Sequence, residues 1–427
     1  MRERPFVADL VKDTYLPKMF RIKQSFPRPR IEVGDIPLRI HALLSEEKFT
    51  SQVKPGMRIA ITAGSRGIAN EALIVKSIVD FVREHGASPF IVPAMGSHGG
   101  ATAEGQAALL AGYGITEEYL HCPIVSSMEV KKIGVNEEGM DVFIDRHAAE
   151  ADGIIVNCRI KPHTAFRGPY ESGIMKMMTI GLGKQHGAEV CHEAGFKNMA
   201  KYVPMFGKAI IKNAPVMFAL AVLENAFDET SEIVALNSDE IEAKEPVYLR
   251  KAFANMPRIL VDSCDVLIVD HIGKNFSGDG MDPNITGTFC TPYATGGIRS
   301  QRVCVLDLSP ETHGNGIGLG YASATTSRLF RKLDLASMYP NAITCTVLGG
   351  VRIPIVMESD REAIQVCVKS CNEIDKAHPR IVRIPNSLHL EHIQLSESYY
   401  EEVKANNAIS IESEPACFPF DSDGNLW

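Results

Sequence analysis

The sequence predicts an α/β protein made of two α/β domains, with the active site in the cleft between them. Short β-branched runs alternate with glycine-rich loops and amphipathic helical segments, which is typical of parallel sheets. A length of 427 residues suits more than one domain. Glycine-rich loops follow the predicted strands directly, where open α/β sheets bind ligands. We place the domains at residues 1–257 and 258–427, and the acidic, aromatic tail of the second could return to the first.

The clearest strand-loop-helix unit begins at residue 57. Residues 57–68 form a β-branched run that ends in Ala-Gly-Ser-Arg-Gly, which predicts a strand and a tight loop. Residues 70–86 predict a helix, because apolar residues recur at helical spacing. Asn70 is the expected N-cap and Gly86 the expected stop.

The same alternation continues along the chain. In the first domain we expect edge strands that include residues 38–44, strands at 88–95, 153–157 and 216–226, a hairpin turning at 137–139, and helices at 103–114, 197–213 and 239–254. In the second domain we expect strands at 259–270 and 302–309, and helices at 324–339 and 359–375, the last with Ser359 as N-cap.

Composition excludes several classes of protein. The formal net charge of −8 argues against a nucleic-acid binder with a basic face. The ten cysteines are scattered and never occur as Cys-x-x-Cys, which indicates reduced thiols and a cytoplasmic protein. The N-terminus is charged and lacks the apolar core of a secretory signal. No apolar stretch approaches the length of a membrane span, so we expect no membrane partner.

The segment 157–192 carries the strongest chemical signal. Lysines, histidines and arginines lie there among Gly, Met, Ile and small residues, and such groups are costly to bury unless they are paired or bound. The pattern predicts a partly dry pocket for an anionic ligand, a metal, or both. The alternative is a glycine-rich connection whose histidines are incidental.

Two histidines are candidates for acid–base catalysis, because imidazole titrates near neutral pH. His98 lies in a Gly-Ser-His-Gly-Gly turn whose glycines leave room for close approach, which favours function over the alternative of a loop histidine that hydrogen-bonds a neighbouring carbonyl. His163 follows Pro162 directly after a strand. Nearby, Lys161 and Arg167 could hold a carboxylate.

Lys176 is a candidate nucleophile. It is flanked by methionines, and desolvation lowers the pKa of an amine and makes it reactive. The alternative is a lysine whose stem covers apolar surface. Lys184 follows Gly-Leu-Gly but lacks the P-loop pattern, so we expect at most a phosphate contact through this loop.

Two further residues could contact a ligand. His192 could be a single metal ligand, with the remaining ligands supplied by a cofactor. Lys274, at a predicted strand end of the second domain, is the expected anion contact from that domain.

The chain resembles the nickel-dependent lactate racemase superfamily of 2-hydroxyacid racemases and epimerases, as a divergent member. The resemblance rests on AGSRG, on GSHGGATAEGQ, on KPH with ESGIMK, and on the later His192, which occur in the family's order. It extends over most of the chain, and the second half matches more loosely.

The resemblance implies a nickel-pincer nucleotide, the nickel pyridinium-3,5-bisthiocarboxylic acid mononucleotide, bound covalently to Lys176. The Ser-Gly-x-x-Lys pattern places Ser172 and Gly173 beside it, and we add Lys184 to this cofactor-binding set. The resemblance implies that His192 ligates nickel.

The resemblance further implies that His98 and His163 are the acid–base pair and that Arg66 contacts the substrate. Arg167 and Lys274 are the further substrate contacts that we expect. The expected activity is an isomerase that inverts C2 of a 2-hydroxy acid by reversible hydride transfer.

The sequence also departs from the family. Ala63 and Gly64 stand where the family has an aspartate in the first loop, and the glutamine and lysine that contact substrate in the family's second domain have no clear counterpart after Asn284. We therefore expect a larger anionic hydroxy acid than lactate, such as a sugar acid or a dicarboxylate. Cofactor-biosynthesis enzymes are the expected loading partners, and a homo-oligomer is left open. The alternatives are a cofactor-dependent oxidoreductase and a non-catalytic protein that binds a cofactor or nucleotide.

Overall fold

The computed structural model describes residues 5–427 and divides them into two compact units. Residues 27–256 form the central unit, and residues 5–26 with 257–427 form the terminal unit. Residues 1–4, part of the charged start that argues against a secretory signal, lie outside the described residues. No described helix is long and apolar enough to cross a membrane. The ten cysteines all lie in the described part and are free thiols.

The central unit is built on a five-stranded sheet in the order β3-β2-β6-β7-β8. The first four strands of that order run parallel, and β8 is antiparallel to β7. The strands are β2 (Arg58–Ala63), β3 (Ser88–Pro93), β6 (Gly153–Arg159), β7 (Val216–Glu224) and β8 (Thr230–Asn237). A separate hairpin pairs β4 (Val130–Val135) with β5 (Asp141–Asp145).

Helices cover both faces of this sheet. They are α2 (Ile36–Leu44), α3 (Glu47–Thr50), α4 (Glu71–Glu84), α5 (Ala103–Gly112), α6 (Glu117–Leu120), α7 (Arg146–Ala149), α8 (Ile174–Lys176), α9 (Lys184–His192), α10 (Met199–Asn213) and α11 (Ile241–Asn255). Side chains alternate between two buried cores along each strand, so Ile59 and Ile61 lie in one core and Ala60 in the other. The strands read as continuous apolar runs because both faces are buried.

The terminal unit contains an eight-stranded sheet in the order β12-β11-β10-β9-β13-β14-β1-β15. Its strands are β1 (Met19–Gln24), β9 (Ser263–Ile272), β10 (Arg299–Leu308), β11 (Ala324–Thr326), β12 (Ile355–Met357), β13 (Ile381–Ile384), β14 (His392–Ser396) and β15 (Ile409–Ile411). Its helices are α1 (Pro5–Val11), α12 (Pro283–Thr286), α13 (Ser327–Arg331), α14 (Leu335–Cys345), α15 (Asp360–Ser370) and α16 (Tyr400–Lys404). Strands β9 to β13 are parallel, and β14, β1 and β15 extend the sheet with antiparallel pairs.

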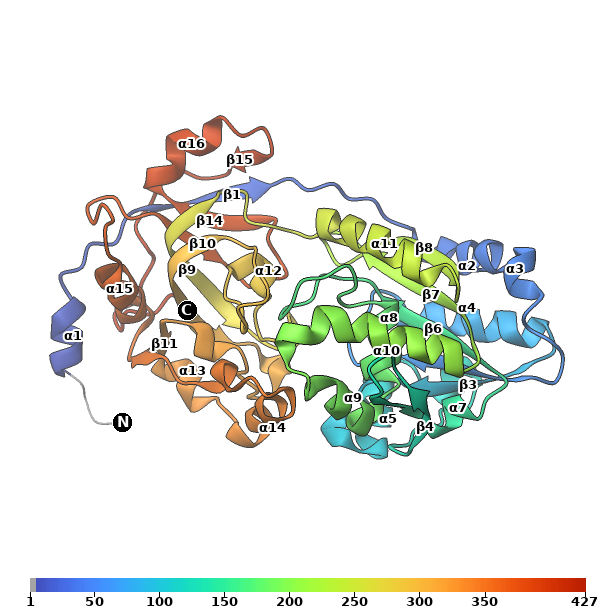
Figure 1. Cartoon of the computed structure of the whole chain (residues 1–427). Helices are drawn as coiled ribbons and strands as arrows, with labels where there is room; N and C mark the ends of the chain where they lie inside the picture. Colours follow the sequence, from blue (N-terminus) through green and yellow to red (C-terminus); the bar gives the residue numbers. More distant parts are fainter. Residues whose placement is uncertain (1–4) are drawn as a thin grey trace. The chain divides into compact units, whose positions relative to one another are not determined.

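The start of the chain differs from the predicted division. β1 pairs with β14 and β15, and Figure 1 shows this blue strand beside the red C-terminal ones. Pairing between the two ends of a chain leaves no local signal in the sequence. The expected edge strand at 38–44 is wrong, because Ile36, Ile40 and Leu44 form the buried face of α2.

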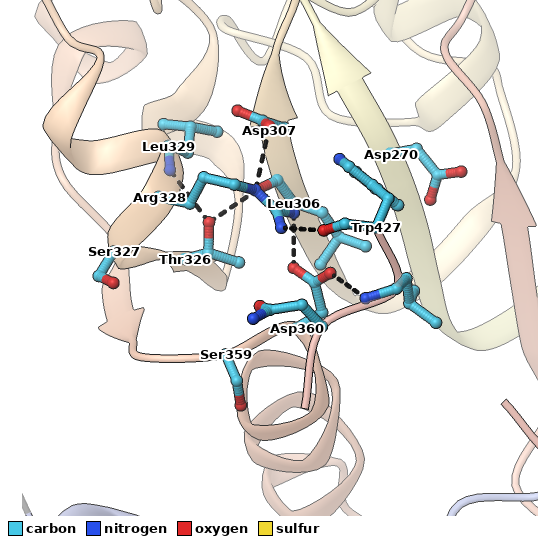
Figure 2. A network of polar contacts seen from close by, with 12 residues as sticks. Asp270, Leu306, Asp307, Thr326, Ser327, Arg328, Leu329, Ser359, Asp360 and Trp427 are labelled. Carbon is cyan, nitrogen blue, oxygen red and sulfur yellow. Dashed lines mark hydrogen bonds and ion pairs between the residues drawn. The ribbon is translucent and has the colours of Figure 1, made fainter. Parts of the chain in front are cut away.

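The C-terminal tail folds onto its own unit. The Arg328 guanidinium lies 3.0 Å from Asp307 and 2.8 Å from Asp360, as Figure 2 shows. Asp360 also accepts a hydrogen bond from the Leu426 amide at 2.8 Å, and the Trp427 ring lies 4.7 Å from the same guanidinium. The acidic, aromatic tail is therefore anchored by a buried ion-pair network in the terminal unit.

The predicted strand-loop-helix units of the central unit are confirmed. β2 leads to α4, β3 leads to α5, and the hairpin lies where it was expected. Asn70 occupies the N-cap position of α4 with φ 61°, but its side chain makes no capping bond. In the terminal unit, the helix expected at 324–339 is divided into β11, α13 and the start of α14. Ser359 caps α15 as predicted, by accepting the Glu362 amide.

Candidate functional site

The loops at the carboxyl ends of β2 and β3 pack on one helical run. A Cβ on Gly64 would lie 3.1 Å from Cε of Met177, so the first loop approaches this run closely. The Gly96 amide of the second loop donates to the Gly181 carbonyl at 3.1 Å. The glycine loops after the two strands therefore border the segment that carries Lys176.

That helical run extends through residues 174–192. It begins with α8, continues as a π-helical turn (Met177–Gly181) and ends with α9. Lys176 is the last residue of α8 and His192 the last residue of α9. Met175 and Met178 are fully buried beside the half-buried Lys176, which matches the predicted apolar surroundings of this lysine. π-Helical turns occur often at functional sites.

A buried carboxylate fixes the start of this run. Glu245 of α11 accepts the Met175 amide at 3.0 Å, and burial raises its pKa to about 7. A Cβ on Gly173 would lie only 2.2 Å from the Glu245 carboxylate, so no other residue fits there without displacement. The Ser-Gly-x-x-Lys pattern thus needs its glycine for the approach of Glu245. Direct contact of Ser172 and Gly173 with a cofactor stays a prediction.

His98 lies at the turn after β3. Its Nδ1 is 2.8 Å from the Met95 carbonyl, so the expected bond from a loop histidine to a neighbouring carbonyl is present. The side chain of the buried Gln106 fixes the backbone of this loop. It donates hydrogen bonds to the carbonyls of Gly96 at 2.9 Å and His98 at 3.2 Å. The imidazole therefore projects from a turn whose backbone is fixed on both sides.

His163 lies in a loop organised around the buried Glu171. The Glu171 carboxylate accepts the His163 amide at 2.7 Å and pairs with Arg167 at 3.2 Å. The His163 Nδ1 accepts the Ala165 amide at 3.0 Å, and its ring lies 4.4 Å from the Phe166 ring. This loop fixes both the position and the orientation of the imidazole.

Several candidate residues lie close enough to affect each other's pKa. Burial, followed by the positive charges of Lys176, His192, Arg66 and Arg167, holds the pKa of His163 well below its usual value. Burial and the Lys176 charge lower the pKa of His192 to about 4. Both imidazoles are therefore neutral at pH 7, and Lys176 lies within electrostatic range of each.

His192 has an unsatisfied buried atom. Its Nδ1 is buried without a hydrogen-bond partner, while its ring stacks at 5.9 Å on Phe196. A neutral imidazole nitrogen is the form that ligates metals. Over residues 5–427, no group of three or more His, Cys, Asp or Glu side chains could hold a metal ion alone. A metal at His192 would need further ligands from another molecule.

Lys184 is a correction to the predicted cofactor-binding set. Its side chain is fully buried, and Nζ pairs with the equally buried Asp145 at 3.3 Å. The same amine donates to the Pro93 carbonyl and, at 3.2 Å, to Gln106. An amine that is enclosed and satisfied in this way is not exposed to a phosphate. Lys184 instead supports Gln106 and, through it, the His98 loop.

The predicted substrate contacts remain predictions. Arg66 is exposed, and its charge lowers the pKa of His163. Arg167 donates to the His163 carbonyl at 2.6 Å and so stabilises its own loop. Lys274 follows β9 in the terminal unit and donates to Asn341 at 2.5 Å. The cleft between the domains, where Lys274 would meet a substrate, also stays a prediction.

Sequence reasoning missed three buried polar residues of the central unit. Glu71, Gln106 and Glu245 lie on helices, where their residue types are common on exposed faces. No local pattern marks them, because their roles come from tertiary contacts.

Comparison with known proteins identifies the segment that carries the site. Residues 13–202 match the family model of the lactate racemase N-terminal domain. This segment is similar to the lactate racemase N-terminal domain. It contains Arg66, His98, His163, Lys176 and His192.

The similarity in fold extends beyond this segment to most of the chain. The lactate racemase apoprotein from Thermoanaerobacterium thermosaccharolyticum is similar with a TM-score of 0.53 and 14% identity, covering 86% of this chain and 94% of that one. A crystal structure of a Thermotoga maritima protein is similar with a TM-score of 0.53 and 11% identity, covering 88% and 99%. No curated protein sequence matches the chain. Because both sequence identities are low, the structural similarity establishes the fold alone.

Proposed function

We propose that the chain binds a nickel-pincer nucleotide through Lys176 and His192 and inverts the C2 stereocentre of an anionic 2-hydroxy acid. One observation carries this proposal above all. Burial and then the charge of Lys176 lower the pKa of both His163 and His192, which supports one site for the amine that would attach the cofactor, the imidazole that would ligate the metal and a candidate acid–base group. The match of residues 13–202 to the lactate racemase N-terminal domain supports the same reading.

The residues present fit such a cofactor. His192 offers a buried neutral imidazole whose Nδ1 has no hydrogen-bond partner. Lys176 lies between the buried Met175 and Met178 in the chain, at the start of a helical run that Glu245 holds in place. When bound, a nickel-pincer nucleotide supplies a reversible hydride acceptor.

Side chains of this protein attract the substrate, meet its hydroxyl group and fix the loops around it. Arg66 presents a positive charge near His163 and attracts an anionic substrate. His98 and His163 contact the hydroxyl group of the substrate, from which a neutral imidazole can accept the proton. Glu171 and Gln106 fix the two loops so that each imidazole meets the substrate in one orientation.

The substrate class follows from the departures in the first loop. Without the family's aspartate at Ala63 and Gly64, lactate is a poor candidate, and a sugar acid or dicarboxylate is the better one. The cofactor-biosynthesis enzymes are the partners that would load Lys176. Net oxidation of a hydroxy acid, with release of the keto acid, is the second candidate, because it would use the same cofactor and the same hydride transfer.

The experiment uses protein produced together with the cofactor-biosynthesis enzymes. Single enantiomers of chiral 2-hydroxy acids are incubated in heavy water, and optical purity, 2-keto acid and deuterium at C2 are measured. We expect optical purity to fall without accumulation of keto acid and without deuterium at C2, because the hydrogen travels as hydride. Lys176→Arg keeps the positive charge and should lose the activity.

The other outcomes decide against the proposal. Stoichiometric accumulation of keto acid would establish the oxidoreductase. Deuterium at C2 would indicate that a base removes the C2 hydrogen as a proton. Full activity of Lys176→Arg would show that covalent attachment at this lysine is not required.

A further inference from the structure

The hydrogen bonds of the two candidate histidines define two different tautomers. A neutral imidazole carries one N–H, and a carbonyl oxygen can only accept. Because His98 Nδ1 lies 2.8 Å from the Met95 carbonyl, the proton of the neutral ring resides on Nδ1 and the lone pair on Nε2. The Ala165 amide donates to His163 Nδ1 at 3.0 Å. The lone pair of His163 is therefore on Nδ1, and its N–H is on Nε2.

The fold holds each ring in its tautomer. The His98 amide also donates to the Met95 carbonyl at 3.1 Å, and Gln106 donates to the carbonyls of Gly96 and His98. On the other loop, Glu171 accepts the His163 amide and Arg167 donates to the His163 carbonyl. A change of tautomer in either ring would break its bond to a backbone group that these contacts hold fixed.

We propose that the two histidines have unequal roles: His98 is the only general base, accepting a proton at Nε2, and His163 is a neutral hydrogen-bond donor at Nε2. The assignment rests on the proposed function for its substrate, and on the two backbone hydrogen bonds for its geometry. His98 can become an imidazolium and keep its bond to Met95. A protonated His163 would direct a second N–H at the Ala165 N–H, which disfavours that state.

The surroundings of His163 support the neutral role. Burial, together with the charges of Lys176, His192, Arg66 and Arg167, holds the pKa of His163 well below its usual value. Its loop carboxylate, Glu171, is occupied by the His163 amide and Arg167. A neutral imidazole that donates from Nε2 can polarise a substrate oxygen without carrying a proton away.

The proton balance is simple. In the forward step the hydroxyl O–H bond breaks, an N–H bond forms at Nε2 of His98, and the electron pair remains on the substrate oxygen. Negative charge that develops on oxygen is stabilised by the Nε2–H of His163. In the return step the same imidazolium gives its proton back. Inversion at C2 would then use one base for both enantiomers, instead of one base on each face.

Nuclear magnetic resonance of the full-length chain tests the assignment without any cofactor. Protein labelled with 15N-histidine is examined by long-range 1H–15N correlation, and the signals of the two rings are identified by their loss in His98→Gln and His163→Gln. We expect the Nδ1–H tautomer for His98 and the Nε2–H tautomer for His163. The same tautomer in both rings would overturn the assignment.

Kinetics of the loaded protein add a second readout. His98→Gln removes the base and should lower the rate by about 10²- to 10⁴-fold, the usual share of general base catalysis. His163→Gln keeps an N–H donor and should lower the rate clearly less. Equal losses in the two variants would contradict unequal roles. Absence of activity in every preparation would instead count against the proposed function, while the tautomers would still be decided by the spectra.

Discussion

Lys184→Met is expected to destabilise the central unit by about 3–5 kcal/mol, the usual cost of removing one partner of a buried ion pair. Lys184 and Asp145 are both fully buried and lie 3.3 Å apart. Without the amine, the Asp145 carboxylate keeps its desolvation penalty and loses its counter-charge. Gln106 also loses a donor. This loss of stability is larger than the destabilisation that most single substitutions cause.

Fluorescence and hydrogen exchange report the unfolding of the two units separately. Trp427 is the only tryptophan and lies in the terminal unit, so its fluorescence reports that unit. Hydrogen exchange of peptides from residues 27–256 reports the central unit. We expect faster exchange in the central unit and an unchanged fluorescence transition in urea.

Two further variants show whether the loss of stability comes from the buried charge. Lys76→Met breaks the partly exposed pair with Asp80 and should cost about 0–1 kcal/mol. Adding Asp145→Asn to Lys184→Met removes the uncompensated charge and should recover part of the loss. If Lys184→Met behaves like Lys76→Met, the buried pair does not stabilise the unit.

Glu71→Gln is expected to remove a large pH dependence of stability. Burial raises the pKa of Glu71 to about 8, opposed by Arg159, and neither carboxyl oxygen makes a hydrogen bond of normal geometry. The folded state therefore holds its proton over a pH range in which the unfolded chain releases it. The stabilisation is complete below about pH 4.5 and is lost as the pH rises towards 8.

The size of this effect follows from the shift. Each tenfold change in proton affinity is worth about 1.4 kcal/mol, so the loss between pH 4.5 and 8 is at most about 5 kcal/mol. We expect the wild type to lose thermal stability across this range and Glu71→Gln to lose clearly less. Glu104→Gln, an exposed glutamate in the first turn of α5, should follow the wild type. Parallel profiles for the wild type and Glu71→Gln would contradict a buried neutral carboxyl.

The fold was predictable where the signals are local. The strand at 57–63 and the helix after it have a β-branched run and a regular apolar face, and both lie where they were expected. β1 was not predictable, because its partners β14 and β15 lie near the other end of the chain. Residues 38–44 were misread because a short apolar run fits a strand as well as a buried helix face.

The candidate site was predictable only in part. His98, His163, Lys176 and His192 stand out by residue type, and the structure places them in one unit. Lys184 was misread because the sequence does not show that an aspartate 39 positions earlier is buried beside it. The buried partners Glu71 and Glu245 have no pattern at all, because their roles come from tertiary packing.

Attachment at Lys176 is the central claim, and peptide mass analysis tests it most directly. Protein produced with the cofactor-biosynthesis enzymes, its Lys176→Arg variant, and a Lys161→Arg variant as control are digested and analysed for added mass and nickel. We expect an adduct on the peptide that contains Lys176, present in Lys161→Arg and absent in Lys176→Arg. An unmodified Lys176 in protein that carries the full cofactor, or the same adduct in Lys176→Arg, would contradict it.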